Sequence, residues 1–119
     1  MGDDFLKKHY CEFDKNLLVG SSLRNVPLIK WKMQHGAGQF SVYAICRAAN
    51  PNDQLDIVHC AVLTQKHYRN NPVHVYGLTE GYSQALDMIV TISARASECG
   101  MDGDLLGYLQ TMGAQEENN

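Results

Sequence analysis

The sequence predicts a small α+β domain, in which an antiparallel sheet of about four strands over residues 26–78 precedes two helices packed on one of its faces. Between residues 26 and 78, short runs of β-branched and aromatic residues are separated by turn-forming residues, as expected for strands. Beyond residue 78, apolar residues recur at three- and four-residue steps, as expected for an amphipathic helix. A length of 119 residues fits one domain, so we assign residues 1–119 to a single domain.

Four segments have strand character. Pro27 restricts the first of them to an edge or a strand start, because proline cannot donate to the hydrogen-bond ladder. Residues 35–38 form a loop of hairpin length, and residues 50–53 are of the types that favour turns. Short loops between consecutive strands favour an antiparallel meander. The expected strands are residues 26–33, 40–47, 55–64 and 73–78.

The longest helix is predicted over residues 80–99. Thr79 stands at the N-cap position, Glu80 lies in the first turn, where the helix dipole favours a negative charge, and Gly100 can end the helix. The apolar stripe of this helix consists of Tyr82, Ala85, Leu86, Ile89, Ile92 and Ala96.

A shorter helix is predicted over residues 104–112. Asp102 or Asp104 is of the residue type that caps a helix N-terminus, and Gly113 is expected to stop the helix. Residues 114–119 are polar and are expected to form a frayed tail.

The predicted strand over residues 55–64 is apolar on both faces, which suits a strand that is covered on both sides. Two helices can cover one face of a four-stranded sheet. The other face then needs the N-terminal segment, a second subunit or a ligand to cover it, and a second subunit could also use a sheet edge. Since twofold homodimers are the commonest oligomers, we expect a homodimer.

Charge is distributed unevenly. Residues 1–79 carry nine Lys/Arg and six Asp/Glu, whereas residues 80–119 carry one Lys/Arg and seven Asp/Glu. This asymmetry indicates two different surfaces. No apolar run approaches the ~20 residues of a membrane-spanning helix, and the N-terminus has no signal-peptide pattern. We therefore expect a cytoplasmic protein without membrane contact. Its four cysteines should be reduced, with Cys46, Cys60 and Cys99 serving as small hydrophobes.

No catalytic or metal-binding motif is recognisable. Zinc sites usually carry paired ligands at short spacing, and neighbours such as His59 and Cys60 would point to opposite faces of a strand. The glycine patterns of nucleophile elbows and phosphate-binding loops are missing. We expect no catalytic residue, no metal and no cofactor.

Two surfaces are candidate binding sites. One is acidic, lies on the predicted helices and would suit a basic protein partner; it consists of Asp87, Glu98, Asp102 and Asp104. The other combines cations with aromatic rings on the sheet, as in surfaces on which bases stack. Its members are Lys30, Trp31, Lys32, Tyr43, Arg47, Arg69, His74 and Tyr76.

These features favour a non-enzymatic binding protein: an inhibitor, adaptor or sequestering protein, such as those of phages and mobile elements, that contacts a protein partner or a nucleotide-like ligand. An alternative is a dimer that binds single-stranded nucleic acid through the basic-aromatic surface. The sequence pI of about 5.9 disfavours that alternative, because nucleic-acid binders are usually basic. A second alternative is a small enzyme with a pocket around His59, His74 and Tyr76.

Overall fold

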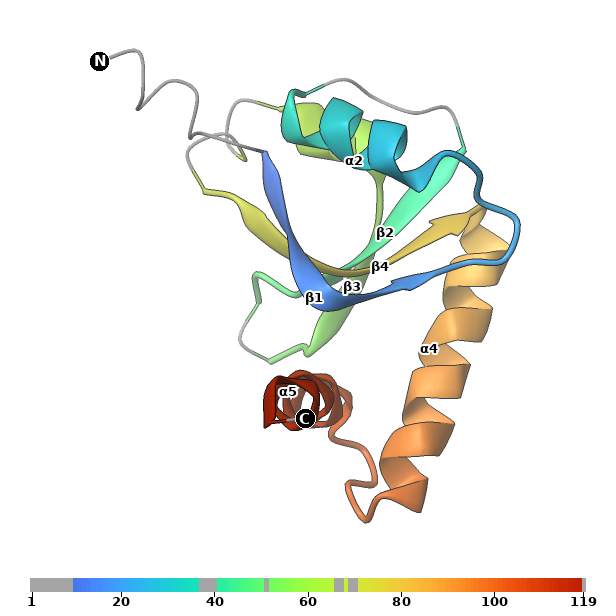
Figure 1. The fold of residues 1–119 in the computed structure, drawn as a ribbon, viewed down its shortest axis with the longest axis vertical. Helices are drawn as coiled ribbons and strands as arrows, with labels where there is room; N and C mark the ends of the chain where they lie inside the picture. Colours follow the sequence, from blue (N-terminus) through green and yellow to red (C-terminus); the bar gives the residue numbers. More distant parts are fainter. Residues whose placement is uncertain (1–9, 37–40, 51, 66–67, 69–70, 119) are drawn as a thin grey trace.

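A computed structural model of the chain describes residues 10–36, 41–50, 52–65, 68 and 71–118. It has a four-stranded sheet with helices on both of its faces (Figure 1). The elements, in chain order, are β1 (Cys11–Val19), α2 (Val26–Gln34), β2 (Val42–Arg47), β3 (Leu55–His59), the 3₁₀ helix η1 (Cys60–Thr64), β4 (Val73–Glu80), α4 (Tyr82–Glu98) and α5 (Leu105–Asn118).

The strand order in the sheet is β1-β4-β2-β3. β2 pairs antiparallel with both β3 and β4, whereas β1 pairs parallel with β4. The α+β class and the mostly antiparallel sheet are confirmed. The expected meander is wrong, because β4 lies between β1 and β2 and only β2 and β3 form a hairpin.

The first expected strand, residues 26–33, is helix α2. Pro27 occupies the first turn of this helix, where its missing N–H leaves no hydrogen bond unmade. Ile29 and Met33, one turn apart, are its buried residues, and Trp31 stacks on His35 with ring centroids 4.2 Å apart. The fourth strand of the sheet is instead β1, a segment for which no strand was predicted.

The strand expected over residues 55–64 is longer than the strand in the structure, β3. It ends at His59, whose Nδ1 accepts the main-chain N–H of Ala61 at 3.0 Å and so caps η1. The helix turns Cys60 and Leu63 into the protein interior. The apolar run therefore reflects a strand followed by a buried helical turn.

Two apolar cores form, one on each face of the sheet. The first core packs α2 and η1 against the sheet, and the second packs α4 and α5 against it. The prediction that both C-terminal helices share one face is confirmed. The face that we expected to need a second copy is covered by α2 and η1, so that argument for a homodimer fails.

The joint between β4 and α4 differs from the expected one. Thr79 and Glu80 are the last residues of β4, and Gly81 is the N-cap of α4. Asp104 does cap α5, since its Oδ1 accepts the main-chain N–H of Gly107 at 3.0 Å. α5 continues past Gly113, its expected end, to Asn118.

The four cysteines, all among the described residues, form no disulfide. Cys11, Cys46 and Cys60 are buried in the first core, whereas Cys99 is exposed, contrary to its expected role as a core residue. Burial raises the pKa of Cys11 and of Cys46 to about 12. Their thiolates are therefore scarce at neutral pH.

We expect one thiol of the native protein, that of Cys99, to react rapidly with a thiol reagent, because the other three are buried. All four should react after denaturation. Counting modified thiols by absorbance or mass spectrometry measures this. Cys99→Ser should abolish the rapid reaction; a rapid reaction that survives this substitution would contradict the packing of the first core.

Candidate functional site

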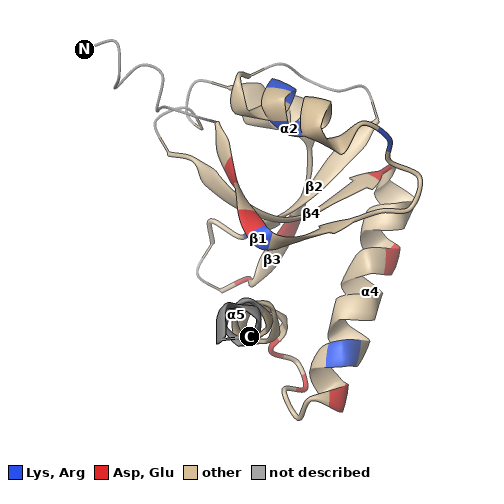
Figure 2. Ribbon diagram, viewed as in Figure 1, with Lys and Arg blue, Asp and Glu red and all other residues tan. Residues whose placement is uncertain are grey.

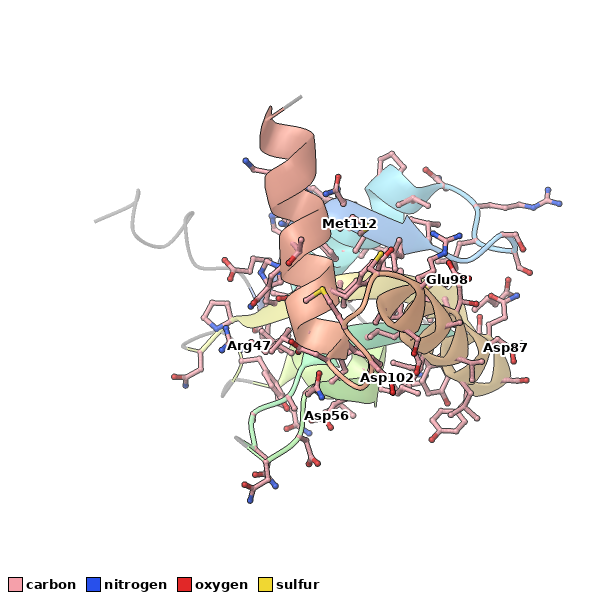
Figure 3. All side chains as sticks on the ribbon, turned by 90° about the horizontal axis from the view of Figure 1, so that it is seen from below. Arg47, Asp56, Asp87, Glu98, Asp102 and Met112 are labelled. Atoms are coloured by element: carbon pink, nitrogen blue, oxygen red, sulfur yellow. The ribbon has the colours of Figure 1, made fainter. Side chains whose placement is uncertain are left out.

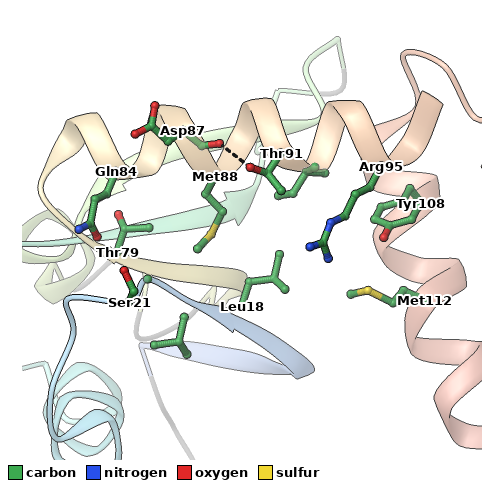
Figure 4. A pocket seen from close by; sticks show the side chains of 13 residues that line it. Leu18, Ser21, Thr79, Gln84, Asp87, Met88, Thr91, Arg95, Tyr108 and Met112 are labelled. Atoms are coloured by element: carbon green, nitrogen blue, oxygen red, sulfur yellow. Dashed lines mark hydrogen bonds between the residues drawn. The ribbon is translucent and has the colours of Figure 1, made fainter. Parts of the chain in front are cut away.

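A groove runs along the flank of α4 that faces the edge strand β1, and α5 borders its far end (Figure 4). Its volume is about 470 Å³, within the ~300–1,000 Å³ typical of ligand pockets. It brings together segments that are distant in sequence. The lining residues are Leu18, Val19, Gly20, Ser21, Thr79, Gln84, Asp87, Met88, Thr91, Ile92, Arg95, Tyr108 and Met112.

The floor of the groove is apolar. Leu18 comes from β1, Met88 and Ile92 from α4, and Tyr108 and Met112 from α5. Ile92 is buried in the second core and gives the floor a fixed base, whereas both methionines are only partly buried. Because the methionine side chain is unbranched and flexible, this floor can adapt to the shape of an apolar ligand.

Polar side chains of α4 line one wall. Asp87 and Arg95 stand eight residues apart, which is ~12 Å along a helix. Between them, Thr91 Oγ1 donates a hydrogen bond to the main-chain oxygen of Asp87 at 3.1 Å. Arg95 extends into the groove, with its guanidinium between Leu18 and Met112 (Figure 4), and no carboxylate of the described residues forms an ion pair with it. The groove thus has an anionic and a cationic end.

Gln84 fixes the anionic end. Its Oε1 accepts the main-chain N–H of Glu80 at 3.1 Å, and its Nε2 donates to Ser22 Oγ at 2.6 Å. Gly20 passes close by: a Cβ there would lie 2.7 Å from Gln84 Oε1 and 3.4 Å from the Cα of Thr79. Glycine therefore lets the chain that leaves β1 approach the start of α4.

Gln54, in the turn between β2 and β3, holds α5 in place. Its Nε2 donates to the main-chain oxygen of Gly103 at 2.7 Å, and its Oε1 accepts the main-chain N–H of Leu106 at 3.0 Å. One side chain thus binds the backbone on both sides of the α5 N-cap. The cationic end of the groove depends on this connection, because α5 supplies two of its floor residues.

The structure brings the predicted acidic residues together only in part (Figure 3). Asp87 lines the groove, while Glu98, Asp102 and Asp104 lie beyond Arg95 at the end of α4 and in the loop after it. Two of them have structural partners: Asp102 accepts a hydrogen bond from Ser97 Oγ, and Asp104 caps α5. Only Asp87 is therefore part of a concave site.

The predicted basic-aromatic surface is divided between the two sides of the sheet. Lys30, Trp31 and Lys32 lie on α2 (Figure 2) and not on a strand as predicted. Arg69 lies outside the described residues. The remaining members lie on strands β2 and β4, and the pair on β4 reaches toward α5 on the other side. They are Tyr43, Arg47, His74 and Tyr76.

His74 lies between two carboxylates of β1. Its Nδ1 is 3.3 Å from Glu12 Oε1, and its Nε2 is 3.0 Å from Asp14 Oδ1. Both ring nitrogens thus face a carboxylate of β1, a group that only accepts hydrogen bonds. Beside it, burial raises the pKa of Tyr76, and a hydrogen bond with Gln110 partly offsets this rise.

The pocket expected around His59, His74 and Tyr76 is not assembled. His74 and Tyr76 are adjacent, with ring centroids 4.7 Å apart. His59 instead contacts Tyr43, which pairs with the last residues of β4, whereas His74 lies near the first residue of that strand. The length of β4 thus separates His59 from the other two.

The comparisons with known proteins name no relative: no protein-family model, curated protein or solved structure matches the chain. In the described part of the chain, no three His, Cys, Asp or Glu side chains are arranged to hold a metal ion. No helix there is both long and apolar enough to span a membrane.

The groove could not be predicted from the sequence, because its residues come from four elements. One signal was present. The apolar stripe assigned to α4 is wider than one buried face needs, and Met88 extends it further. An apolar stripe this wide indicates a helix with an exposed apolar flank. It does not reveal which strand or helix stands opposite.

Proposed function

We propose that this chain is a non-enzymatic binding protein, of the inhibitor, adaptor or sequestering kind, and that it holds an extended segment of a protein partner in the groove between β1, α4 and α5. The observation that carries the proposal is the combination of an apolar floor with a sheet edge beside it. An extended peptide can add to such an edge through main-chain hydrogen bonds and place alternate side chains in a pocket.

The edge strand β1 differs along its length. Its pairing register with β4 shifts between Phe13 and Leu18, and this irregular half carries Lys15. Bulges and lysines protect an edge from adding a further strand. The two residues after the shift, Leu18 and Val19, pair regularly with β4 and border the groove, and in the described part of the chain no strand pairs with their outer side. The end of the edge that lacks these protections thus coincides with the groove.

Charge indicates what the bound segment carries. Asp87 at one end would attract a basic side chain, and Arg95 at the other an acidic side chain or a terminal carboxylate. Apolar side chains between them would contact Met88 and Met112. We therefore expect an amphipathic segment of about five extended residues, since five residues span ~16 Å.

The geometry favours this function over binding of nucleic acid. The cations and rings expected to form one surface are divided between α2 and the opposite side of the sheet. Arg95 is the only cation among the groove residues, and Asp87 would repel a phosphate. An enzyme finds less support as well, because His59, His74 and Tyr76 are not gathered into one pocket.

Selection of peptides from a displayed random library, with the purified chain as the target, tests the proposal. We expect selected peptides to carry alternating apolar residues with an acidic residue at one end. Their amide shift perturbations should cluster on the end of β1 and on α4. Arg95→Ala should weaken binding by about tenfold, as expected for loss of a charge-assisted hydrogen bond worth ~1.5 kcal/mol.

Arg24→Ala is the matched control, because Arg24 is an exposed arginine outside the groove; it should leave the affinity unchanged. A single-stranded oligonucleotide serves as a second probe. If the selected peptides perturb other surfaces, or if the oligonucleotide binds tightly and loses affinity between ~50 and ~200 mM salt, the proposal is wrong.

A further inference from the structure

The second flank of α4, which faces β3, is exposed and apolar. Tyr82, Leu86 and Val90, at four-residue steps, are 52%, 46% and 67% exposed. Seven large apolar side chains among the described residues are at least 38% exposed, and three of them form this one row. Single exposed apolar residues are ordinary, but an aligned row marks an interaction surface.

The charges of α4 avoid this flank. Between Tyr82 and Ser97 the helix carries two charged residues, and neither belongs to the row: Arg95 lines the groove on the opposite flank, and Asp87, three residues before Val90, borders the row on the solvent side. The neighbouring part of the sheet is uncharged as well. Ile57 of β3 pairs with Ile45 on the face that α4 covers, while Asp56, the adjacent residue, alternates to the other face.

Aromatic contacts order one end of the flank. The ring of Tyr82 packs edge-on against Tyr43 of β2, with centroids 5.7 Å apart, and Tyr43 packs against His59 of β3 at 4.9 Å. This arrangement holds Tyr82 in place although half of it is exposed. A preordered aromatic side chain loses little conformational entropy when a partner covers it.

The side chains on this flank are large in the first part of the helix and small in the last part. The large residues Tyr82, Leu86 and Val90 are followed by Ser93, Ala94 and Ser97. Its midpoint lies between Ile89 and Val90. If two such flanks lie antiparallel about a twofold axis, Tyr82 meets the partner's Ser97, and Leu86 meets the partner's Ser93. Large side chains then face small ones, as ridges packed into grooves require.

We propose that α4 is the dimerisation helix, and that its uncharged flank (Tyr82, Leu86, Val90, Ser93, Ala94 and Ser97) pairs antiparallel with the same flank of a second copy. A twofold interface must be complementary to itself, which this arrangement of large and small residues satisfies. α4 has 17 residues and is therefore ~25 Å long. One flank of a helix of this length offers little contact area beside the ~800 Å² per partner of a standard interface, and we therefore expect a weak dimer.

This inference goes beyond the proposed peptide binding and places the two sites on opposite flanks of one helix. In the dimer both grooves remain open and point away from the twofold axis. The dimer can therefore hold two partner segments at once, and a partner with two segments gains avidity without any new contact.

Sedimentation equilibrium over the micromolar range tests the dimer. We expect the mass to rise with concentration from the monomer value of 13.3 kDa toward twice that value. Val90→Glu and Leu86→Glu should each give the monomer mass throughout, because they bury an unpaired charge in the interface. Leu28→Glu is the matched control: Leu28 is 43% exposed and lies on α2, across the sheet. It should leave the dimer intact.

Cross-linking tests the antiparallel register. In a Cys99→Ser background, we mix chains that carry Tyr82→Cys with chains that carry Ser97→Cys and oxidise the mixture. Disulfides should form mainly between the two kinds of chain, whereas a parallel pair would cross-link chains of the same kind. A wild-type chain that stays monomeric, or a dimer that survives Val90→Glu with unchanged circular dichroism, overturns the proposal. Groove peptides should still bind the Val90→Glu monomer, so this result is independent of the proposed function.

Discussion

Replacing Leu78 with alanine is expected to lower the free energy of unfolding by about 2–5 kcal/mol, the range found for buried leucines. Leu78 is fully buried in the first core, and it pairs with Val19 of β1 and Ala44 of β2 in the middle of the sheet. The substitution leaves a cavity that neighbouring strands cannot fill without breaking their hydrogen bonds. Urea unfolding measures the change as a lower transition midpoint at unchanged slope.

Leu28→Ala provides the control for this measurement. Leu28 is 43% exposed, so its truncation should change stability by no more than about 0.5 kcal/mol. Leu78→Met should cost less than about 1.5 kcal/mol, because it nearly conserves volume. Equal losses for Leu78→Ala and Leu28→Ala would show that the first core is not the centre of stability that the structure indicates.

Gly81→Ala is expected to destabilise the protein by about 1–3 kcal/mol, the cost of holding a non-glycine residue in a sparsely populated backbone region. Gly81 has φ 79° and ψ 153°, a combination that glycine alone adopts readily. An added Cβ would meet no atom within 4 Å. The loss is therefore entirely a backbone effect, and it falls at the joint from which α4 starts.

The same unfolding measurement separates backbone strain from loss of a helix cap. Gly81→Asn should be as destabilising as Gly81→Ala, because asparagine tolerates the left-handed helical region but not this value of ψ. Ser83→Ala, an exposed change in the first turn of α4, should have little effect. Full stability of Gly81→Asn would mean that a capping side chain, and not φ, decides the residue at this position.

The sequence was most informative where a pattern is long. α4 was predicted to within two residues at each end, because its apolar spacing extends over four turns. α2 was wrongly predicted as a strand. The segment has only nine residues, and Pro27 is compatible with both a strand start and the first turn of a helix. The buried pair Ile29 and Met33 is the signal that favours a helix.

Tertiary contacts decided the other errors. β1 alternates Cys11 and Phe13, which face the core, with Glu12 and Asp14, which face His74, but its charges and register shift obscure the alternation. The apolar run over residues 55–64 is similar in composition throughout, so composition does not show that β3 ends and η1 begins within it. Neither the parallel pairing of β1 nor the groove beside it can be predicted from local patterns, because both depend on segments far apart in the chain.

The two hydrogen bonds of Gln54 have a consequence for the thermodynamics of the groove. α5 is a C-terminal helix whose first turn is attached to the β2–β3 turn by one side chain, and it supplies Tyr108 and Met112 to the groove floor. Any occupant that contacts this floor binds only molecules in which α5 is docked, so its apparent affinity is reduced by the docked fraction. Occupancy and docking are linked in both directions. A bound segment raises the docked population of α5, and a helix shifted toward its docked state increases affinity without touching the ligand.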